Sequence, residues 1–203
     1  MQVVGHEYPP GLVERKHGPA GYRTYASYLD WLRDEFVFRC VYCLHREQWY
    51  GRATSFAIDH LVPVSERTER ENDYFNLVYS CSTCNSAKND ILDLPDPSVV
   101  SYRDCLRAEL DGRVLALNDE GKKLCGALRM NSDSNIAYRH RWIRILTALK
   151  STHPQDFTSL MGFPADLPDL RPPKRRVPSN SIPDGALNCF FVQREFGTLP
   201  KAY

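Results

Sequence analysis

Residues 40–90 read CVYCLHREQWYGRATSFAIDHLVPVSERTERENDYFNLVYSCSTCNSAKND, and this stretch decides the fold. It contains two Cys-x-x-Cys pairs, Cys40 with Cys43 and Cys81 with Cys84. The spacing inside each pair lets both sulfurs of one turn converge on a single tetrahedral ion, and four thiolates suit zinc. We therefore expect a structural Zn²⁺ site, because four cysteines fill every ligand position and leave none for a substrate.

The alternative function for such pairs is redox chemistry of the thioredoxin type. That interpretation needs a strand-helix-strand pattern around one pair, which the sequence lacks. The seven cysteines of the chain would also leave one unpaired in a full set of disulfides. His45, two residues after the first pair, is a candidate substitute ligand, but with four cysteines available we expect an exposed loop residue.

A second group of residues in the same stretch has the chemistry of a hydrolytic site. Asp59 and His60 end a short apolar run that begins near Ala53 and is stopped by Pro63, and Asn85 directly follows the second cysteine pair. A carboxylate and an amide offer oxygen ligands to a hard cation such as magnesium. An imidazole beside them can take a proton from water near neutral pH.

Taken singly, these residues have ordinary structural interpretations. His60 could be a structural histidine, and Asn85 could be a helix cap. In the hydrolytic interpretation, by contrast, Asn76 would brace the loop around His60 through side-chain hydrogen bonds to the backbone. Adjacent residues of a regular strand point to opposite faces, so Asp59 and His60 share one site only if the strand ends, bulges or twists there.

The order and spacing of these motifs resemble those of the HNH nucleases, over roughly residues 40–90. The resemblance implies that His60 is the general base, that Asn76 is supportive, and that Asn85 binds the catalytic metal beside Asp59. Because the last position is asparagine, the chain resembles the H-N-N variant found in the HNH domains of RNA-guided CRISPR effectors. The catalytic ion would then be Mg²⁺ or Mn²⁺, and the products would carry a 5′-phosphate and a 3′-hydroxyl.

The net charge of +1 does not by itself indicate a nucleic-acid-binding protein. Arg139, Arg141 and Arg144, however, lie in a segment, residues 134–155, that contains no Asp or Glu. We expect these three arginines to contact the DNA backbone, with a solvated helix face as the alternative. Lys88, in the helix predicted after the second cysteine pair, could reach a phosphate, and an exposed helix lysine is its alternative.

With 203 residues, 42% of them hydrophobic and 25% charged, the chain can form one core. We expect an α+β protein with a zinc-clamped ββα-metal (His-Me finger) core. Apolar periodicity predicts helices over 22–38, 85–92, 102–110, 121–130 and 135–150. The expected segments are a lead-in and helix over 1–39, the nuclease core over 40–95, a helical part packed on the core over 96–153, and an extended proline-rich tail over 154–203.

These patterns predict a metal-dependent DNA endonuclease of the cytoplasm. We find no apolar region long enough for a secretory signal or a membrane span. No specificity module such as a helix-turn-helix is recognisable, so we expect control by a protein partner. A small protein of this build resembles the nuclease subunits of bacterial anti-phage systems such as Septu, where an ATPase partner licenses cutting.

Other functions stay open at this point. A non-catalytic zinc module that binds nucleic acid or protein would keep the four cysteines without needing His60. A restriction or homing-type nuclease would have its own sequence preference. RNA also stays open as a substrate. One site cuts one strand, so a double-strand break would need a homodimer, a second visit or a partner.

Overall fold

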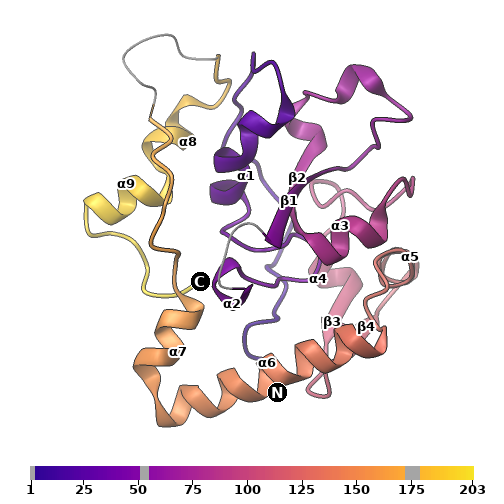
Figure 1. Ribbon diagram of the computed structural model, residues 1–203, viewed down its shortest axis with the longest axis vertical. Coiled ribbons are helices and arrows are strands. Elements are labelled where there is room, and N and C mark those ends of the chain that lie inside the picture. The colour runs from indigo at the N-terminus through magenta and orange to yellow at the C-terminus, as the bar shows by residue number, and fades with distance from the viewer. Residues whose placement is uncertain (1–2, 51–54, 172–178) are drawn as a thin grey trace.

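The computed structural model describes residues 3–50, 55–171 and 179–203, in which helices surround two small antiparallel sheets (Figure 1). Ala53, where we expected the first strand to begin, lies outside the described residues. The elements in chain order are η1 (Tyr25–Tyr28), α1 (Leu29–Glu35), α2 (Glu47–Tyr50), β1 (Phe56–His60), η3 (Thr68–Arg70), η4 (Tyr74–Asn76), β2 (Leu77–Cys81), α3 (Ser82–Lys88), α4 (Tyr102–Cys105), β3 (Leu106–Ala108), β4 (Val114–Ala116), α5 (Asp119–Ala127), α6 (Asp133–Thr152), α7 (Pro154–Met161), α8 (Pro183–Leu187) and α9 (Phe190–Glu195).

Strands β1 and β2 and helix α3 follow one another in the predicted order. The two strands pair antiparallel, with Phe56 opposite Cys81 and His60 opposite Leu77. Every residue of β2 is buried, which suits its β-branched and aromatic residues Val78 and Tyr79. Helix α3 begins directly after β2 and contacts both strands. The protein is thus a mixed helix and sheet structure, and β1 is regularly paired from Phe56 through Asp59 to its last residue, His60.

The helix predicted over residues 102–110 is wrong beyond its first turn. After α4 the chain enters β3, which forms a hairpin with β4. Gly112 lies in the turn with φ +89, and a Cβ there would clash with the backbone oxygen of Ile136. Glycine therefore allows both the turn and its close contact with α6, and the strand pairing outweighs the local helical periodicity.

Helices α5 and α6 agree with the sequence prediction. The side chain of Asn118 caps α5 by accepting a hydrogen bond from the Gly121 amide at 2.8 Å. Helix α6 has 20 residues, and Arg139, Ile143 and Leu146 recur on its buried face at helical spacing. Neither it nor any other helix in the described part of the chain is long and apolar enough to cross a membrane.

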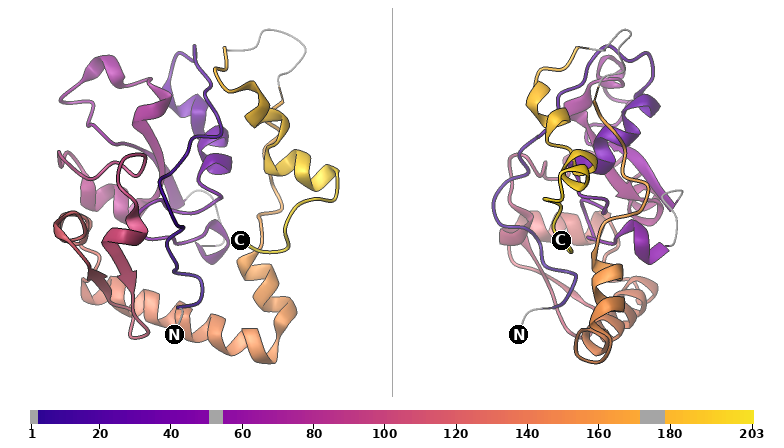
Figure 2. Two further views of the ribbon diagram at one scale, coloured as in Figure 1. Left: turned by 180° about the vertical axis from the view of Figure 1, so that it is seen from behind. Right: turned by 90° about the vertical axis from the view of Figure 1, so that its left-hand side faces the viewer.

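The prediction of an extended tail over residues 154–203 is also wrong. This segment contains α7, α8 and α9, and Figure 2 shows α8 and α9 stacked along the α1 side of the molecule. Pro154 and Pro183 occupy the first position of α7 and α8. Proline is well tolerated there because its missing amide would have no helical partner, so these prolines begin helices instead of preventing them.

Buried charge joins α1, α2 and β2. The guanidinium of Arg33 donates two hydrogen bonds to the Glu47 carboxylate, at 2.9 and 2.8 Å, and the Tyr79 hydroxyl donates to the same carboxylate at 2.6 Å. The side chains of Arg33 and Glu47 are only 7% and 3% exposed. Each charge is therefore paired, and the loss of either partner would leave the other buried alone.

Replacing Arg33 with Met should lower the free energy of unfolding by roughly 3–5 kcal/mol, because the Glu47 carboxylate would lose its counter-ion in the interior. Urea denaturation followed by circular dichroism measures this change. Arg107→Met is the matched control, since the Arg107–Glu109 pair is 63% and 39% exposed. That variant should change stability by less than about 1 kcal/mol. Equal losses in the two variants would contradict the assignment.

Candidate metal and nuclease site

The four cysteines of the two pairs form one buried cluster. Their sulfur atoms all lie within 4.8 Å of one another, and the sulfurs of Cys43 and Cys81 are 3.6 Å apart. A tetrahedral zinc ion with Zn–S bonds of about 2.3 Å holds its sulfurs about 3.8 Å apart, so the spacing fits zinc. Buried thiolates this close would repel one another, and a divalent cation removes that repulsion. The expected four-cysteine metal cluster is thus present in the structure.

The expectation for His45 is wrong, because this side chain is buried instead of exposed. Its Nδ1 lies 3.0 Å from the Tyr50 hydroxyl, and its ring packs 4.7 Å from the ring of Tyr138 on α6. It lies outside the group of four metal-ligating side chains. His45 therefore packs between the cysteine cluster and α6.

His60 is the last residue of β1 and is only partly buried. Its Nε2 lies 3.0 Å from the backbone carbonyl oxygen of Glu71, and the Tyr25 ring meets its ring edge-on with centroids 4.9 Å apart. A carbonyl oxygen only accepts hydrogen bonds, so Nε2 must be the donor. In the neutral ring Nδ1 then carries the lone pair, which is the form that a general base needs.

Asn76 is fully buried and braces the loop that follows His60. Its Oδ1 accepts from the Val62 amide at 2.9 Å, and its Nδ2 donates to the carbonyls of Val62 at 3.0 Å and Arg70 at 3.3 Å. The amide side chain uses both its donor and its acceptor, which neither a carboxylate nor an aliphatic residue could do. Asn76 thus connects both ends of the loop that carries Glu71.

Asp59 faces the interior, on the side of β1 opposite to His60. Its Oδ2 accepts from the Tyr42 hydroxyl at 2.7 Å, and its Oδ1 lies 3.2 Å from the Nζ of Lys88. Burial raises the pKa of the Asp59 carboxyl, and the ammonium of Lys88 is the largest influence that opposes this shift. The pairing through Asp59 and His60 is regular, so the two side chains point to opposite faces of β1 and the structure does not bring them to one site as expected.

The structure corrects the expectation of an exposed Lys88. The residue is 1% exposed, and its ammonium donates to the His60 carbonyl at 2.6 Å besides contacting Asp59. In this conformation it cannot contact a phosphate. A lysine that points along the buried face of α3, one turn beyond Cys84, has no sequence signal that separates it from an exposed one.

Asn85 is not a helix cap, because α3 begins at Ser82 and its N-cap position is Cys81. It is the residue after Cys84, so the cysteine cluster determines its place on the helix. Its amide oxygen and the Asp59 carboxylate are hard donors of the kind that Mg²⁺ and Mn²⁺ bind. In the structure the Asp59 carboxylate is already paired with a cation, the ammonium of Lys88.

The three arginines of α6 do not share one environment. Arg139 is 2% exposed and its guanidinium donates to the backbone carbonyls of Gly112 and Met130. The expectation that it contacts DNA is wrong, because these bonds tie α6 to the β3–β4 hairpin. Arg141 and Arg144 are exposed on the opposite face of the helix. Only these two retain the predicted surface position.

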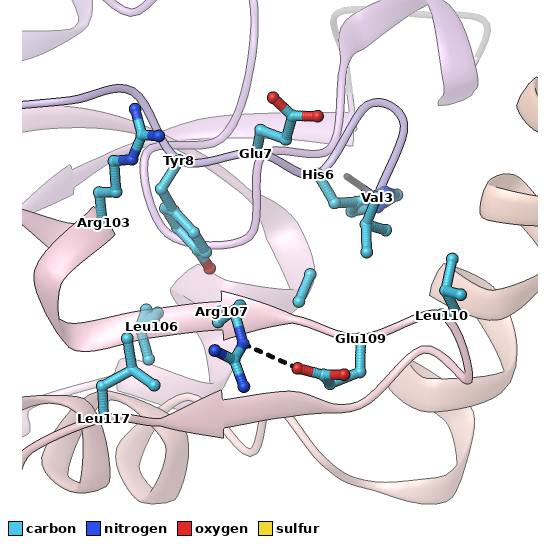
Figure 3. Close-up of a pocket in the computed structure, with 11 residues that line it drawn as sticks. Val3, His6, Glu7, Tyr8, Arg103, Leu106, Arg107, Glu109, Leu110 and Leu117 are labelled. Carbon is cyan, nitrogen blue, oxygen red and sulfur yellow. Dashed lines mark hydrogen bonds and ion pairs between the residues drawn. The ribbon is translucent and has the colours of Figure 1, made fainter. Parts of the chain in front are cut away.

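A cavity of about 520 Å³ lies between the N-terminal segment and β3 (Figure 3). Val3, His6 and Tyr8 line one wall, and Leu106 and Arg107 line the other, where Arg107 pairs with Glu109. None of the predicted catalytic or metal-binding residues contributes to its lining. The cavity is therefore separate from the candidate nuclease site.

Three residues that contact the candidate site escaped the sequence analysis. Glu71 acts through its backbone carbonyl, which no side-chain pattern can reveal. Tyr25 belongs to the apolar periodicity of the N-terminal helix, and that periodicity indicated only core packing. Tyr42 stands between the first two cysteines, so its place beside the metal cluster was visible although its bond to Asp59 was not.

Replacing Cys81 with Ser should remove most of the zinc and lower stability by an amount on the order of 5 kcal/mol, because structural zinc binding contributes directly to folding. Elemental analysis and urea denaturation give the two values. Cys125→Ser is the control, since Cys125 is half-buried outside the cluster. It should keep one zinc per chain. A Cys81→Ser protein with full zinc content and stability would contradict the site.

Comparison with known families agrees with this geometry. The family model for HNH endonuclease matches residues 40–90, the stretch that contains both cysteine pairs, β1, β2 and α3. No curated protein matches the chain. Residues 40–90 are thus similar to the HNH endonucleases, a family of metal-dependent nucleases, and this similarity suggests nuclease activity.

Proposed function

We propose that the protein is a metal-dependent endonuclease that hydrolyses phosphodiester bonds of DNA. The observation that carries this proposal is the orientation of His60. Its Nε2 is held by the Glu71 carbonyl, so Nδ1 is left as the basic atom at the end of β1. The similarity of residues 40–90 to the HNH endonucleases supports the same reaction.

In the proposed reaction His60 takes a proton from water at Nδ1 while the water oxygen attacks phosphorus. The bond from phosphorus to the 3′ oxygen breaks, which leaves a 5′-phosphate and a 3′-hydroxyl. Asn76 keeps the loop of Glu71 in place and so maintains the direction of the imidazole. Asp59 and Asn85 would hold Mg²⁺ or Mn²⁺, which when bound supplies charge stabilisation to the phosphate and to the leaving oxygen.

DNA is the proposed substrate, and Arg141 and Arg144 are proposed contacts to its backbone. Helix α6 runs along the end of the molecule opposite to the segment of residues 61–76 that follows His60 (Figure 1). Arginines on α6 would therefore contact phosphates remote from the scissile bond. Such contacts position a duplex without reading its sequence.

We further propose that a protein partner controls the nuclease, as in anti-phage systems of the Septu type with their ATPase. The low net charge of +1 supports this idea, because a protein with little net positive charge binds DNA weakly at cellular salt. A partner or a second copy of the chain would then supply the affinity, and it would also allow both strands to be cut.

His60→Ala should reduce nicking of supercoiled plasmid by at least about 100-fold, because a general base contributes roughly 10²–10⁴ to such a rate. Nicking should require Mg²⁺ or Mn²⁺ and stop with EDTA. His153→Ala, at an exposed position after α6, is the control and should cut normally. A non-catalytic zinc module would instead leave the plasmid intact with every variant, while a His60→Ala protein that cuts normally would exclude His60 as the base.

Arg141→Ala and Arg144→Ala should each weaken binding to a short duplex at low salt and reduce the slope of log affinity against log salt by about 1, since each removes one phosphate contact. Fluorescence anisotropy measures both quantities. Arg107→Ala, on the exposed face of β3, should leave affinity and slope unchanged. Unaltered binding in the α6 variants would indicate a solvated helix face.

A further inference from the structure

Lys88 forms the only contact between a positively charged side chain and Asp59 among the described ion pairs. The ammonium lies 3.2 Å from Oδ1, and the two side chains are 1% and 6% exposed. Lys88 is the last residue of α3 and also donates to the carbonyl of His60 at 2.6 Å. The buried ammonium thus holds the carboxylate and the backbone of the proposed base together.

The same carboxylate has no room for two cations of full charge. Its Oδ2 accepts the Tyr42 hydroxyl at 2.7 Å and its Oδ1 contacts the ammonium at 3.2 Å, so a metal ion on this carboxylate would share it with Lys88. A divalent ion within coordination distance of Oδ1 would lie a few ångströms from the ammonium, and like charges this close repel strongly in a buried site. The two cations therefore exclude one another.

We propose that Lys88 is a built-in counter-cation for Asp59, that a divalent cation displaces it, and that a phosphate of bound nucleic acid receives the displaced ammonium. The inference rests on the proposed function, because it takes Asp59 as a ligand of the catalytic metal. The flexible four-carbon stem of lysine allows such a movement from the end of α3. The ammonium keeps Asp59 paired whenever the metal is absent, so the fold does not depend on the catalytic ion.

This exchange couples metal binding to nucleic-acid binding. Without nucleic acid, a divalent ion that binds Asp59 has to displace the ammonium of Lys88, and the displaced ammonium gains no new anionic partner. With nucleic acid bound, the phosphodiester provides that anion, and the metal binds more tightly. Coupling of this kind is reciprocal, so the divalent ion should raise the affinity for nucleic acid by the same factor.

The test measures Mn²⁺ binding to zinc-loaded protein through the EPR signal of free Mn²⁺. Lys88→Met removes the competing charge and should bind Mn²⁺ at least tenfold more tightly than the wild-type protein. The double variant Asp59→Asn with Lys88→Met should lose this gain. Lys122→Met is the matched control, because Lys122 pairs with Asp119 at an exposed position. It should bind Mn²⁺ as the wild type does.

A second set of measurements uses proteins that keep Lys88. In a His60→Ala protein, which holds DNA without cutting it, a short duplex should raise Mn²⁺ affinity at least tenfold. In the same His60→Ala protein, addition of Mn²⁺ and duplex should expose Lys88 to an amine-reactive reagent, as peptide mass spectrometry reports, while labelling of Lys122 stays constant. These readouts apply even if Lys88→Met does not fold.

Mn²⁺ affinity that is equal or lower in a folded Lys88→Met protein would overturn the inference. Unchanged labelling of Lys88 when Mn²⁺ and duplex are bound would do the same. Neither readout requires cleavage, so the two failures are distinguishable. If the wild-type protein nicks plasmid but Lys88 does not compete, only the counter-cation role is lost. If Lys88 competes for Asp59 but no plasmid is nicked, the nuclease function fails and the exchange stands.

Discussion

Four cysteine sulfurs within 4.8 Å of one another are the constraint on which the rest of the structure depends. They bring the turn before α2 to the junction of β2 and α3, and this arrangement is compatible with a zinc ion that would hold the two segments together. Strand β1 pairs along β2, and its last residue, His60, therefore has a defined place relative to the cluster. The cysteine cluster thus determines how β1, β2 and α3 lie relative to one another.

Several positively charged side chains are buried in the interior of the protein. Arg33 pairs with Glu47, Lys88 pairs with Asp59, and Arg139 donates to two backbone carbonyls. Each buried cation has partners, because an unpaired charge in the interior would be strongly destabilising. These cations connect elements that are distant in sequence.

The sequence was sufficient to predict the parts of the site that are carried by spacing. The two Cys-x-x-Cys pairs indicated the cluster, and the strand, strand, helix order followed from the apolar runs around Asp59 and Asn85. Spacing could not predict which of two helix faces is buried, so Lys88 and Arg139 were expected at the surface. It also could not show the Glu71 carbonyl, since every residue has one. The segment over residues 154–203 was expected to be extended because proline disrupts the interior of a helix. Proline is favourable in the first turn of a helix, however, and Pro154 and Pro183 lie there.

The reaction itself is tested most directly by the ends that it leaves. Plasmid nicked by the zinc-loaded protein with Mn²⁺ should be resealed by a DNA ligase, which joins only a 5′-phosphate to a 3′-hydroxyl. Complete resealing is the predicted result, because an activated water that attacks phosphorus and expels the 3′ oxygen leaves these two ends. Nicks that the ligase cannot close, or nicks that form equally well in EDTA, would contradict a metal-dependent hydrolysis at His60.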